Sequence, residues 1–327
     1  MTKHEFMFRL EKALSGLSEN EKNEALRYYD DYLSDCGSDN LADVLSQLGS
    51  PEKLAEEIKN DIDDASSADT EEAKAAARED GEQVYRGESD IIRKLPPFNS
   101  ANIQLLNSKG VIERGSDYSF TWTSGSTSSI LKVKVADSTL YVEEKVSTGR
   151  FWNFSFGSVK GNTFRLTLPE KDFDAINFHC VNGSMSIYDL NVDNLSVSNI
   201  NGSISVHDTI AAQLSMKTVN GSVTADPITC GKATGSTVNG SMRLSGSFDG
   251  DTDLSTVNGS INLTTNRRLS SYNISARSLG SIRINDERVR NDNSSIGRSV
   301  YTANNNASRT ITAHANNGSI RLNTSAD

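Results

Sequence analysis

The sequence is poor in the residues that mark several common classes of protein. Its 327 residues include three cysteines, Cys36, Cys180 and Cys230, and no Cys-x-x-Cys spacing, so neither a disulfide framework nor a zinc site is expected. The 4 histidines do not have metal-ligand spacing, and no P-loop, GxGxxG or GxSxG motif occurs. We therefore expect no cofactor, no metal and no enzymatic activity.

Long apolar runs are also absent. No run is long enough for a membrane-spanning helix, which needs about 18 consecutive apolar residues. The opening stretch MTKHEFMFRLEKAL mixes acidic with apolar residues and has no small-residue cleavage site, so it is not expected to be a signal peptide. The expected location is the cytoplasm, with association to a membrane left open. The alternative is the cell surface, by a route that the sequence does not show.

Positive charge is scarce in the first 95 residues, which hold 12 Lys and Arg against 24 Asp and Glu. The rest of the chain holds 21 and 19, so the net charge of −10 comes from the front part. Nucleic-acid binding needs clustered Lys and Arg, so no nucleic-acid partner is expected.

The first sixty residues carry the caps and the apolar periodicity of four short helices. Thr2 and Glu5 form a capping box at the first helix, and Ser18 and Glu21 form another at the second. A third apolar stripe covers 41–48, and a proline at a first helical position opens the fourth helix. This part of the chain is predicted to be a small all-α domain.

Two motifs in this segment carry a family resemblance. They are FMFRLEKALSGLSENEKNEALRYYDDYLSD, with its spaced leucines, glutamates and tyrosines, and DVLSQLGSPEKLAEEI, with a closing LG.PE..A.EI pattern. Residues 1–62 thereby resemble the HAAS-type bacterial helical domain. The resemblance implies a cytoplasmic signalling or adaptor domain. It also implies a protein partner, either a PadR-like regulator or an envelope-stress component.

Three tyrosines of the second predicted helix have two interpretations. Tyr28, Tyr29 and Tyr32 form an aromatic patch for a protein partner, or else Tyr29 and Tyr32 belong to the buried face that includes Leu26. Residues 63–95 follow the helices, are acidic and rich in alanine, and have no apolar face. They are predicted to be a linker.

The second part of the chain repeats the tetrapeptide VNGS and close variants of it. Five of its glycines are spaced 19 residues apart, another follows after 21, in LGS, and the last after a further 38, which is two periods. A strict period of this size predicts a solenoid. The repeated asparagine–glycine pairs are Asn182–Gly183, Asn201–Gly202, Asn220–Gly221, Asn239–Gly240, Asn258–Gly259 and Asn317–Gly318.

The apolar residues of the repeat predict two strands per copy. The positions two and four residues after each glycine are apolar in all copies, which predicts a strand with one buried face. A second strand precedes the glycine. The aliphatic residue directly before each asparagine is predicted to face the interior too; these residues are Val181, Ile200, Val219, Val238 and Val257.

The repeated Asn-Gly-Ser has three interpretations. Asn-Gly is a strong hairpin signal, and Asn-x-Ser is also a glycosylation acceptor. The apolar spacing favours a corner between two strands of one coil, since a hairpin would pair Val with Ser. Glycine would supply a positive φ, and stacked asparagines would form a hydrogen-bonded ladder. The hairpin remains the alternative, and a sugar is not expected without a signal peptide.

Further strand-like segments precede the repeat: ANIQLL, YSFTWT, ILKVKVA, TLYVEEKV and TFRLTLP. With LTLPEKDFDAINFHCVNGSMSI at its centre, the region 96–327 resembles the bacterial "putative adhesin" domain, which has an L.LP motif followed by repeated NG.I.V units. The resemblance implies a β-solenoid and an association with the cell envelope, without an established activity. Residues 286–310 depart from the period and are predicted to be a degraded coil or a projecting loop.

Stacked carboxylates are the strongest candidates for chemistry. Asp189 and Asp208 lie six residues after their glycines, and Asp226 lies five after its own. Such a stack binds a cation or flanks a sugar in polysaccharide-cleaving enzymes. The alternative is a polar strand end at a loop.

The sequence thus predicts a mainly β protein, a parallel β-solenoid with about 19 residues per coil after a small all-α domain. The favoured function is a non-enzymatic signalling or scaffold protein linked to the cell envelope. The helical domain would be its protein-interaction module, and the solenoid its sensing or binding surface. The alternative is a cell-surface adhesin that binds glycan or protein, and a carbohydrate-active enzyme ranks third.

Overall fold

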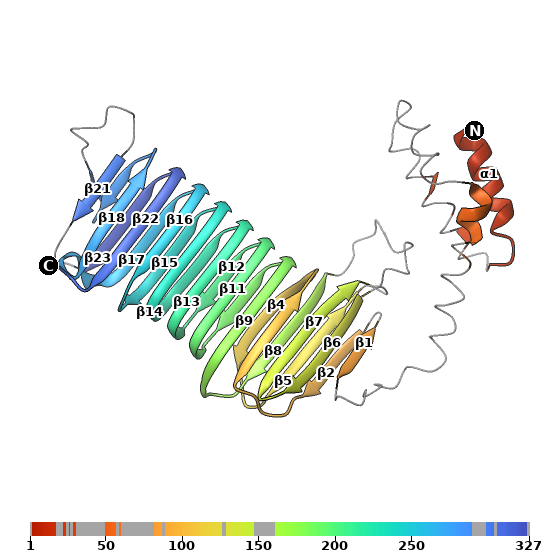
Figure 1. The fold of residues 1–327 in the computed structure, drawn as a ribbon, viewed down its shortest axis with the longest axis horizontal. Helices are drawn as coiled ribbons and strands as arrows, with labels where there is room; N and C mark the ends of the chain where they lie inside the picture. Colours follow the sequence, from red (N-terminus) through yellow and green to blue (C-terminus); the bar gives the residue numbers. More distant parts are fainter. Residues whose placement is uncertain are drawn as a thin grey trace. The chain divides into compact units, whose positions relative to one another are not determined.

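The chain divides into two compact units, a helical unit toward the N-terminus and a β-sheet unit. A computed structural model describes residues 2–17, 22–23, 26, 29–30, 50–56, 59, 82–86, 89–125, 129–146, 161–289, 299–303 and 306–325. A small helical region with a mainly β remainder confirms the predicted fold class at this level (Figure 1). Among the described residues, no helix is long and apolar enough to span a membrane.

The helical unit begins with α1 (Lys3–Ala13), and its start follows the predicted capping box. Thr2 is the N-cap, and its Oγ1 accepts a hydrogen bond of 3.2 Å from the backbone N of Glu5. The described residues 51–56 are also helical. The unit has its own core, made of Phe6, Leu10, Leu14, Tyr29, Leu54 and Ala55. The third predicted helix, over 41–48, lies outside the described residues.

The β-sheet unit is built from coils, each with a long strand, a corner and a short strand. The long strands of the central coils are β9 (Asp172–Asn182), β11 (Asn191–Asn201), β13 (Thr209–Asn220), β14 (Val223–Asn239) and β16 (Thr252–Asn258). The short strands are β10 (Met185–Tyr188), β12 (Ile204–His207), β15 (Met242–Phe248) and β17 (Ile261–Arg268). Strand β14 provides the short strand of one coil and the long strand of the next.

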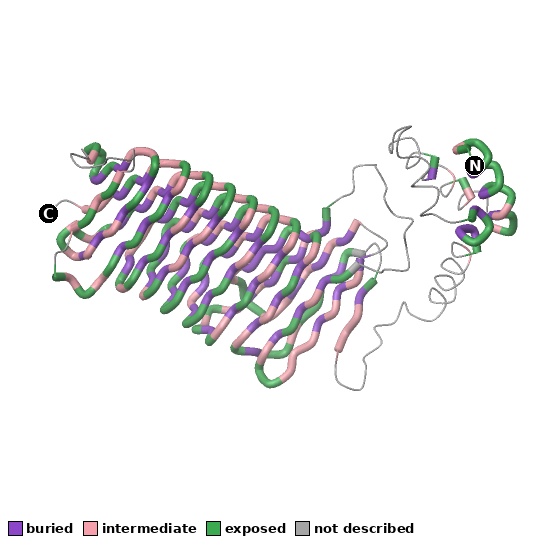
Figure 2. Tube along the Cα trace, turned by 45° about the horizontal axis from the view of Figure 1, so that its top comes forward, coloured by how far each residue is buried: buried purple, intermediate pink, exposed green. Residues whose placement is uncertain are grey.

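Neighbouring coils pair in parallel, with equivalent residues opposite each other. Val197 of β11 lies between Phe178 of β9 and Met216 of β13. Alternate side chains point inward, which gives the regular bands of buried residues in Figure 2. All three of these side chains are at most 1% exposed, as are the predicted inward residues Ile187 and Ile261. A continuous apolar core therefore runs through the stack.

The first coil in the sequence does not stand at the end of the stack. It consists of β3 (Ser100–Leu105) and β4 (Ser108–Arg114), and β3 pairs in parallel with both β9 and β7 (Thr139–Val146). Strand β4 likewise lies between β10 and β8 (Asn162–Leu168). The chain therefore returns to place the coil of β7 and β8 outside its first coil.

The same inversion occurs at the other end of the stack. Strands β22 (Arg309–Asn317) and β23 (Ile320–Ser325) lie between the coil of β16 and β17 and the coil of β18 (Tyr272–Ser278) and β19 (Ile282–Ile284). Figure 1 shows β22 between β16 and β18. The last coil in the sequence thus fills a place between two earlier ones, although the period suggests simple sequential order.

Antiparallel strands cover both ends of the stack. At one end, β1 (Gln83–Arg86) pairs with β6 (Ser129–Ala136), and β2 (Ser89–Lys94) pairs with β5 (Ser119–Ser124). At the other, β20 (Glu287–Arg288) pairs with β19, and β21 (Ser299–Ala303) pairs with β18. These strands occupy the sheet edges, which would otherwise be open to pairing with other chains.

These end strands correct two predictions. The linker predicted over 63–95 is too long, because 83–86 and 89–94 are strands of the β-sheet unit. The described part of 286–310 is neither a degraded coil nor a simple projecting loop, because it contributes β20 and β21. Charged residues and weak apolar periodicity hid these strands in the sequence.

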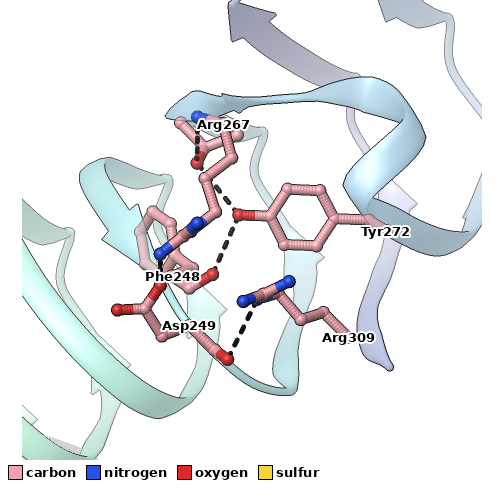
Figure 3. A network of polar contacts seen from close by, with 6 residues as sticks. Phe248, Asp249, Arg267, Tyr272 and Arg309 are labelled. Carbon is pink, nitrogen blue, oxygen red and sulfur yellow. Dashed lines mark hydrogen bonds and ion pairs between the residues drawn. The ribbon is translucent and has the colours of Figure 1, made fainter. Parts of the chain in front are cut away.

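A buried tyrosine, Tyr272, lies where the chain skips one position in the stack (Figure 3). Strands β22 and β23 fill that position, between the coil of β16 and β17 and the coil of β18 and β19. The 3₁₀ turn η1 (Leu269–Ser271) leads from β17 into β18, and Tyr272 follows it with no exposed surface. Its hydroxyl donates to the carbonyl O of Phe248 at 2.9 Å and lies 3.0 Å from Thr265 Oγ1. Asp249 contacts Arg267 through its carboxylate and accepts from Arg309 Nε through its carbonyl, at 3.1 Å. These contacts connect four coils.

Candidate functional site

The Asn-Gly-Ser segments are corners, with a long strand before and a short strand after. Strand β9 ends at Asn182 and β10 begins at Met185, yet each pairs with strands of neighbouring coils and not with the other. The same arrangement holds for the next corner, where Gly202 N donates to Asn220 O of the following coil at 2.9 Å. The hairpin alternative is therefore wrong, because no ladder joins the two strands.

The corner asparagines form one continuous ladder of side-chain hydrogen bonds. In each step Nδ2 donates to Oδ1 of the preceding coil, at 2.8–2.9 Å, for Asn182, Asn201, Asn220, Asn239, Asn258 and Asn317. The first acceptor is Asn107, which the repeat search missed because its corner reads NSK in place of NGS. All of these side chains are exposed, so the ladder is a surface feature.

Glycine occupies the corners for a different reason from the predicted one. Only Gly183 and Gly202 have a positive φ, of 151° and 146°; the other corner glycines do not. In every corner a Cβ would collide with the carbonyl oxygen of the neighbouring corner, which is that of Ser108 for Gly183 and of Gly221 for Gly240. Close backbone approach between coils therefore excludes side chains here.

A column of buried residues, most of them polar, lies three residues before the corner glycines, with Cys180 before Gly183, Ala315 before Gly318 and Ser278 only two residues before Gly280. Thr218 and Thr237 are at most 4% exposed, and each donates its hydroxyl to the carbonyl of the preceding coil's glycine, at 3.1 and 2.9 Å. The equivalent residues Asn199, Thr256 and Ser278 make the same bond. Sequence reasoning missed this column, although a hydroxyl or amide stands three residues before four of the corner glycines, Gly202, Gly221, Gly240 and Gly259. The polar members of the column donate to glycine carbonyls that would otherwise be buried without a hydrogen-bond partner.

The aliphatic residue before each asparagine faces outward, which corrects the inward prediction. Ile200, Val238 and Val257 are 40%, 39% and 41% exposed. The buried polar column takes the inward place next to them, and alternation then turns the aliphatic side chains to the surface. The resulting aliphatic stripe consists of Leu106, Val181, Ile200, Val219, Val238, Val257 and Leu279. We call the stripe, the asparagine ladder and the corner serines the corner ridge.

A buried carboxylate closes the ridge at the end of β7. Glu144 is 6% exposed and accepts from Leu106 N, Asn107 N and Ser108 Oγ at 2.7–3.1 Å. Asn162 Nδ2 donates to it as well, at 2.9 Å. Glu144 thus replaces the acceptors that a further corner would provide, a role that no pattern in the sequence indicates.

The aspartates proposed for chemistry are turn residues. Asp189 and Asp208 have φ values of 53° and 48°, a left-handed conformation that Asp tolerates better than most residues. The Asp189 carboxylate pairs with Arg114 at 2.9 Å. Among the described residues, no group of three His, Cys, Asp or Glu is arranged to hold a metal ion. The polar strand end is thus the interpretation that the geometry supports.

Two of the described histidines have local partners, and the two described cysteines are buried. His179 Nδ1 lies 2.8 Å from Ser198 Oγ, and His207 Nδ1 lies 2.7 Å from the Asp226 carbonyl. Burial raises the pKa of Cys180 to about 11 and that of Cys230 to about 12. Both thiols are therefore protonated at neutral pH and are poor nucleophiles.

Of the three tyrosines predicted to form an aromatic patch, the structure describes the side chain of Tyr29. Tyr29 is 6% exposed and packs in the core with Phe6, so it cannot belong to an exposed patch. Tyr28 and Tyr32 lie outside the residues whose side chains the structure describes. The core interpretation holds for Tyr29.

The fold and the ridge define a class: a β-solenoid with stacked asparagine corners, joined to a small helical domain. Family models match both parts, HAAS over residues 5–57 and Toastrack DUF4097 over residues 111–288. The second match covers more than half of the chain, so the chain belongs to the Toastrack DUF4097 family, and the HAAS resemblance is confirmed. A search among curated proteins gave no match.

Several solved structures are similar to the chain at low identity. One is a putative adhesin from Bacteroides fragilis, with 15% identity and a TM-score of 0.38, over 73% of this chain and 98% of that one. Another is a putative cell adhesion protein from Clostridium sporogenes, with 12% identity and a TM-score of 0.30, over 72% and 99%. These values are too low to support a conclusion about function.

Proposed function

We propose that the chain is a non-enzymatic binding protein of envelope-linked signalling, in which the HAAS domain contacts one protein and the corner ridge binds another. The aliphatic stripe carries this proposal. Four of its side chains, those of Ile200, Val238, Val257 and Leu279, are 39–43% exposed. With Val219, the first three form an unbroken aliphatic run along one edge of the stack, and Asn316 separates Val257 from Leu279. Contiguous exposed apolar surface is typical of interaction sites.

The ridge suits a protein segment better than a glycan. Its described residues are aliphatic side chains, asparagine amides and serines, without an aromatic ring on which a sugar could stack. A segment with its own row of apolar side chains fits the stripe, and its polar groups meet the amides of the ladder. The backbone of the corners is fixed by bonds such as Gly240 N to Asn258 O, 3.1 Å, so the surface is formed before binding.

The proposal of a non-enzymatic role rests on how the fold holds the two candidate carboxylates, Asp189 and Asp208. Asp189 is held in a turn and paired with Arg114, and its neighbour Asp208 is held in the equivalent turn. A glycosidase needs two free carboxylates at a fixed separation across a substrate. The carbohydrate-active alternative therefore lacks support at the place where the sequence suggested it.

Site-directed photo-crosslinking in living cells tests the ridge. A photoreactive residue in place of Val238 should give a protein adduct, whereas one in place of Thr224, which faces outward near the start of the same strand β14, should not. The adduct should disappear when Val219 and Val257 are both replaced by Ser. Equal adducts from both positions, or none from Val238, would contradict a protein site on the ridge.

Protease treatment of intact cells, with a tag at each end of the chain, separates signalling from adhesion. Both tags should survive until the cells are lysed, because the proposal places the chain inside the cell at the envelope. Loss of the tag on the β-sheet unit from intact cells would favour the adhesin alternative.

A further inference from the structure

A row of arginines crosses five consecutive strands on the face after the corners. Arg243 of β15 lies opposite Asn262 of β17, which lies opposite Arg321 of β23. Arg283 of β19 lies opposite Arg321, and Arg288 of β20 lies opposite Arg283. Directly opposite residues share a face, so these side chains form one line, about 19 Å long at about 4.8 Å per strand. All four arginines are exposed.

The last three members of this arginine row are neighbours of like charge with almost no internal compensation. Arg321 Nε lies 3.6 Å from Asp286, whose side chain is 76% exposed. Arg243, Arg283 and Arg288 make no ion pair with the described part of the chain. Like charges directly opposite each other destabilise a sheet.

Two arginines toward the other end of the stack, Arg165 and Arg114, are paired with carboxylates. Arg165 lies in the same outward column at the far end of the stack, and it pairs with Glu113. Arg114 pairs with Glu170 and Asp189, both at 2.9 Å. Arg165 and Arg114 are thus neutralised within the fold, whereas Arg243, Arg283 and Arg288 of the row are not.

The surroundings of the row define the ligand that it fits. Apart from the exposed carboxylate of Asp286 beside Arg288, the flanking outward positions are hydroxyls and amides: Ser241, Ser260, Ser319 and Ser281 on one side, and Ser245, Thr264, Asn323 and Asn285 on the other. Such groups donate to phosphate oxygens, and arginine binds phosphate through two parallel bonds. No aromatic side chain borders the described row, so bases have nothing to stack on.

We propose that the arginine row binds a linear, phosphate-bearing polymer, which lies along the line of the four arginines. A linear polymer matches a single line of charge, whereas a membrane surface would be met by a broad basic area and exposed apolar side chains. This site borders the corner ridge at the corner serines Ser241, Ser260 and Ser319 but does not use the aliphatic stripe, so its test is separate from that of the function proposed for the ridge.

Titration of the full chain with inorganic polyphosphate of defined length tests the proposal. Binding should weaken steeply with added salt, since bound cations are released from the polymer. The double variant Arg283→Gln with Arg321→Gln should bind at least about tenfold more weakly, because it removes two charge-assisted contacts. Its melting temperature should not fall, because the substitutions relieve like-charge repulsion. Arg165→Gln is the matched control and should bind as the unchanged protein does.

Each other outcome overturns the proposal. Polyphosphate binding that is absent, or equal in the double variant, removes the site. Binding to phosphatidylglycerol vesicles that the double variant loses, without binding to polyphosphate, assigns the row to a membrane. Tighter binding to a thymidine oligonucleotide of the same charge than to polyphosphate assigns it to nucleic acid.

Discussion

Single residues hold the corners together, and the most restrictive of them are the glycines. Each corner stacks so closely on the next that the glycine of one faces the carbonyl of another. The threonines of the buried polar column then satisfy these carbonyls, as Thr237 does for Gly221. Glycine therefore leaves space for the carbonyl of the neighbouring corner, and threonine donates a hydrogen bond to a carbonyl of this kind.

Gly240→Ala is expected to destabilise the β-sheet unit by about 3 kcal/mol or more, because the new Cβ collides with backbone that cannot move away. Urea unfolding followed by circular dichroism measures the change. Gly161→Ala is the control, since a Cβ there meets nothing within 4 Å and the cost should be small. Equal unfolding midpoints for the two variants would refute the crowding of the corners.

Thr237→Val is expected to cost about 1–2 kcal/mol, because it keeps the shape of the side chain but removes the donor to the Gly221 carbonyl. Thr224→Val, on the outward face, should change stability by less than about 0.5 kcal/mol. The same urea titration compares the two. A cost for Thr237→Val no larger than that of its control would mean that the hydroxyl bond contributes nothing.

At the scale of the strand, the two sides of a corner differ in what they bury. The short strand points its apolar residues into the core, as Ile261 does with no exposed surface. The long strand ends with a polar residue inside and an aliphatic one outside, as with Thr256 and Val257. Stability and binding are therefore assigned to different residues of one repeat.

Ile261→Asp is expected to unfold the stack or open it to protease, since a buried carboxylate at this place has no partner. Val238→Asp should leave folding nearly intact, because its side chain is 39% exposed. Limited proteolysis and thermal melting compare the variants. A Val238→Asp protein as unstable as Ile261→Asp would restore the inward position that the sequence pattern first suggested.

At the scale of the whole β-sheet unit, spatial order differs from chain order at both ends. The coil of β22 and β23 supports two neighbours, β16 with β17 and β18 with β19. In a solenoid built in sequence order, the last coil would support only one. The C-terminal strands are therefore internal parts of the stack.

Deletion of residues 309–327 is expected to expose the coil that precedes them in sequence, because β18 and β19 lose their parallel partners. Hydrogen exchange should show that 272–284 lose protection while 185–225 keep it. Retained protection of 272–284 in the shortened chain would contradict the placement of β22 and β23.

The sequence by itself determined the repeat, the corner and the inward columns of the short strand. These follow from local rules, since a period of two defines a strand face and a strict longer period defines stacked copies. The five strand-like segments before the repeat are also strands, namely β3, β5, β6, β7 and β8. Asn-Gly identified the corners but not why glycine is needed there.

Only the tertiary structure decided which residues face outward at the corner and in which order the coils stack. A shift of one residue exchanges the two faces of a strand, and hydrophobicity favoured Val257 over Thr256 for the interior. The carbonyl of Gly240, which accepts from Thr256 at 3.0 Å, reverses that choice. Stacking order is hidden for a related reason: the copies share the same columns, so any coil can pair with any other, and only the connections select the neighbours.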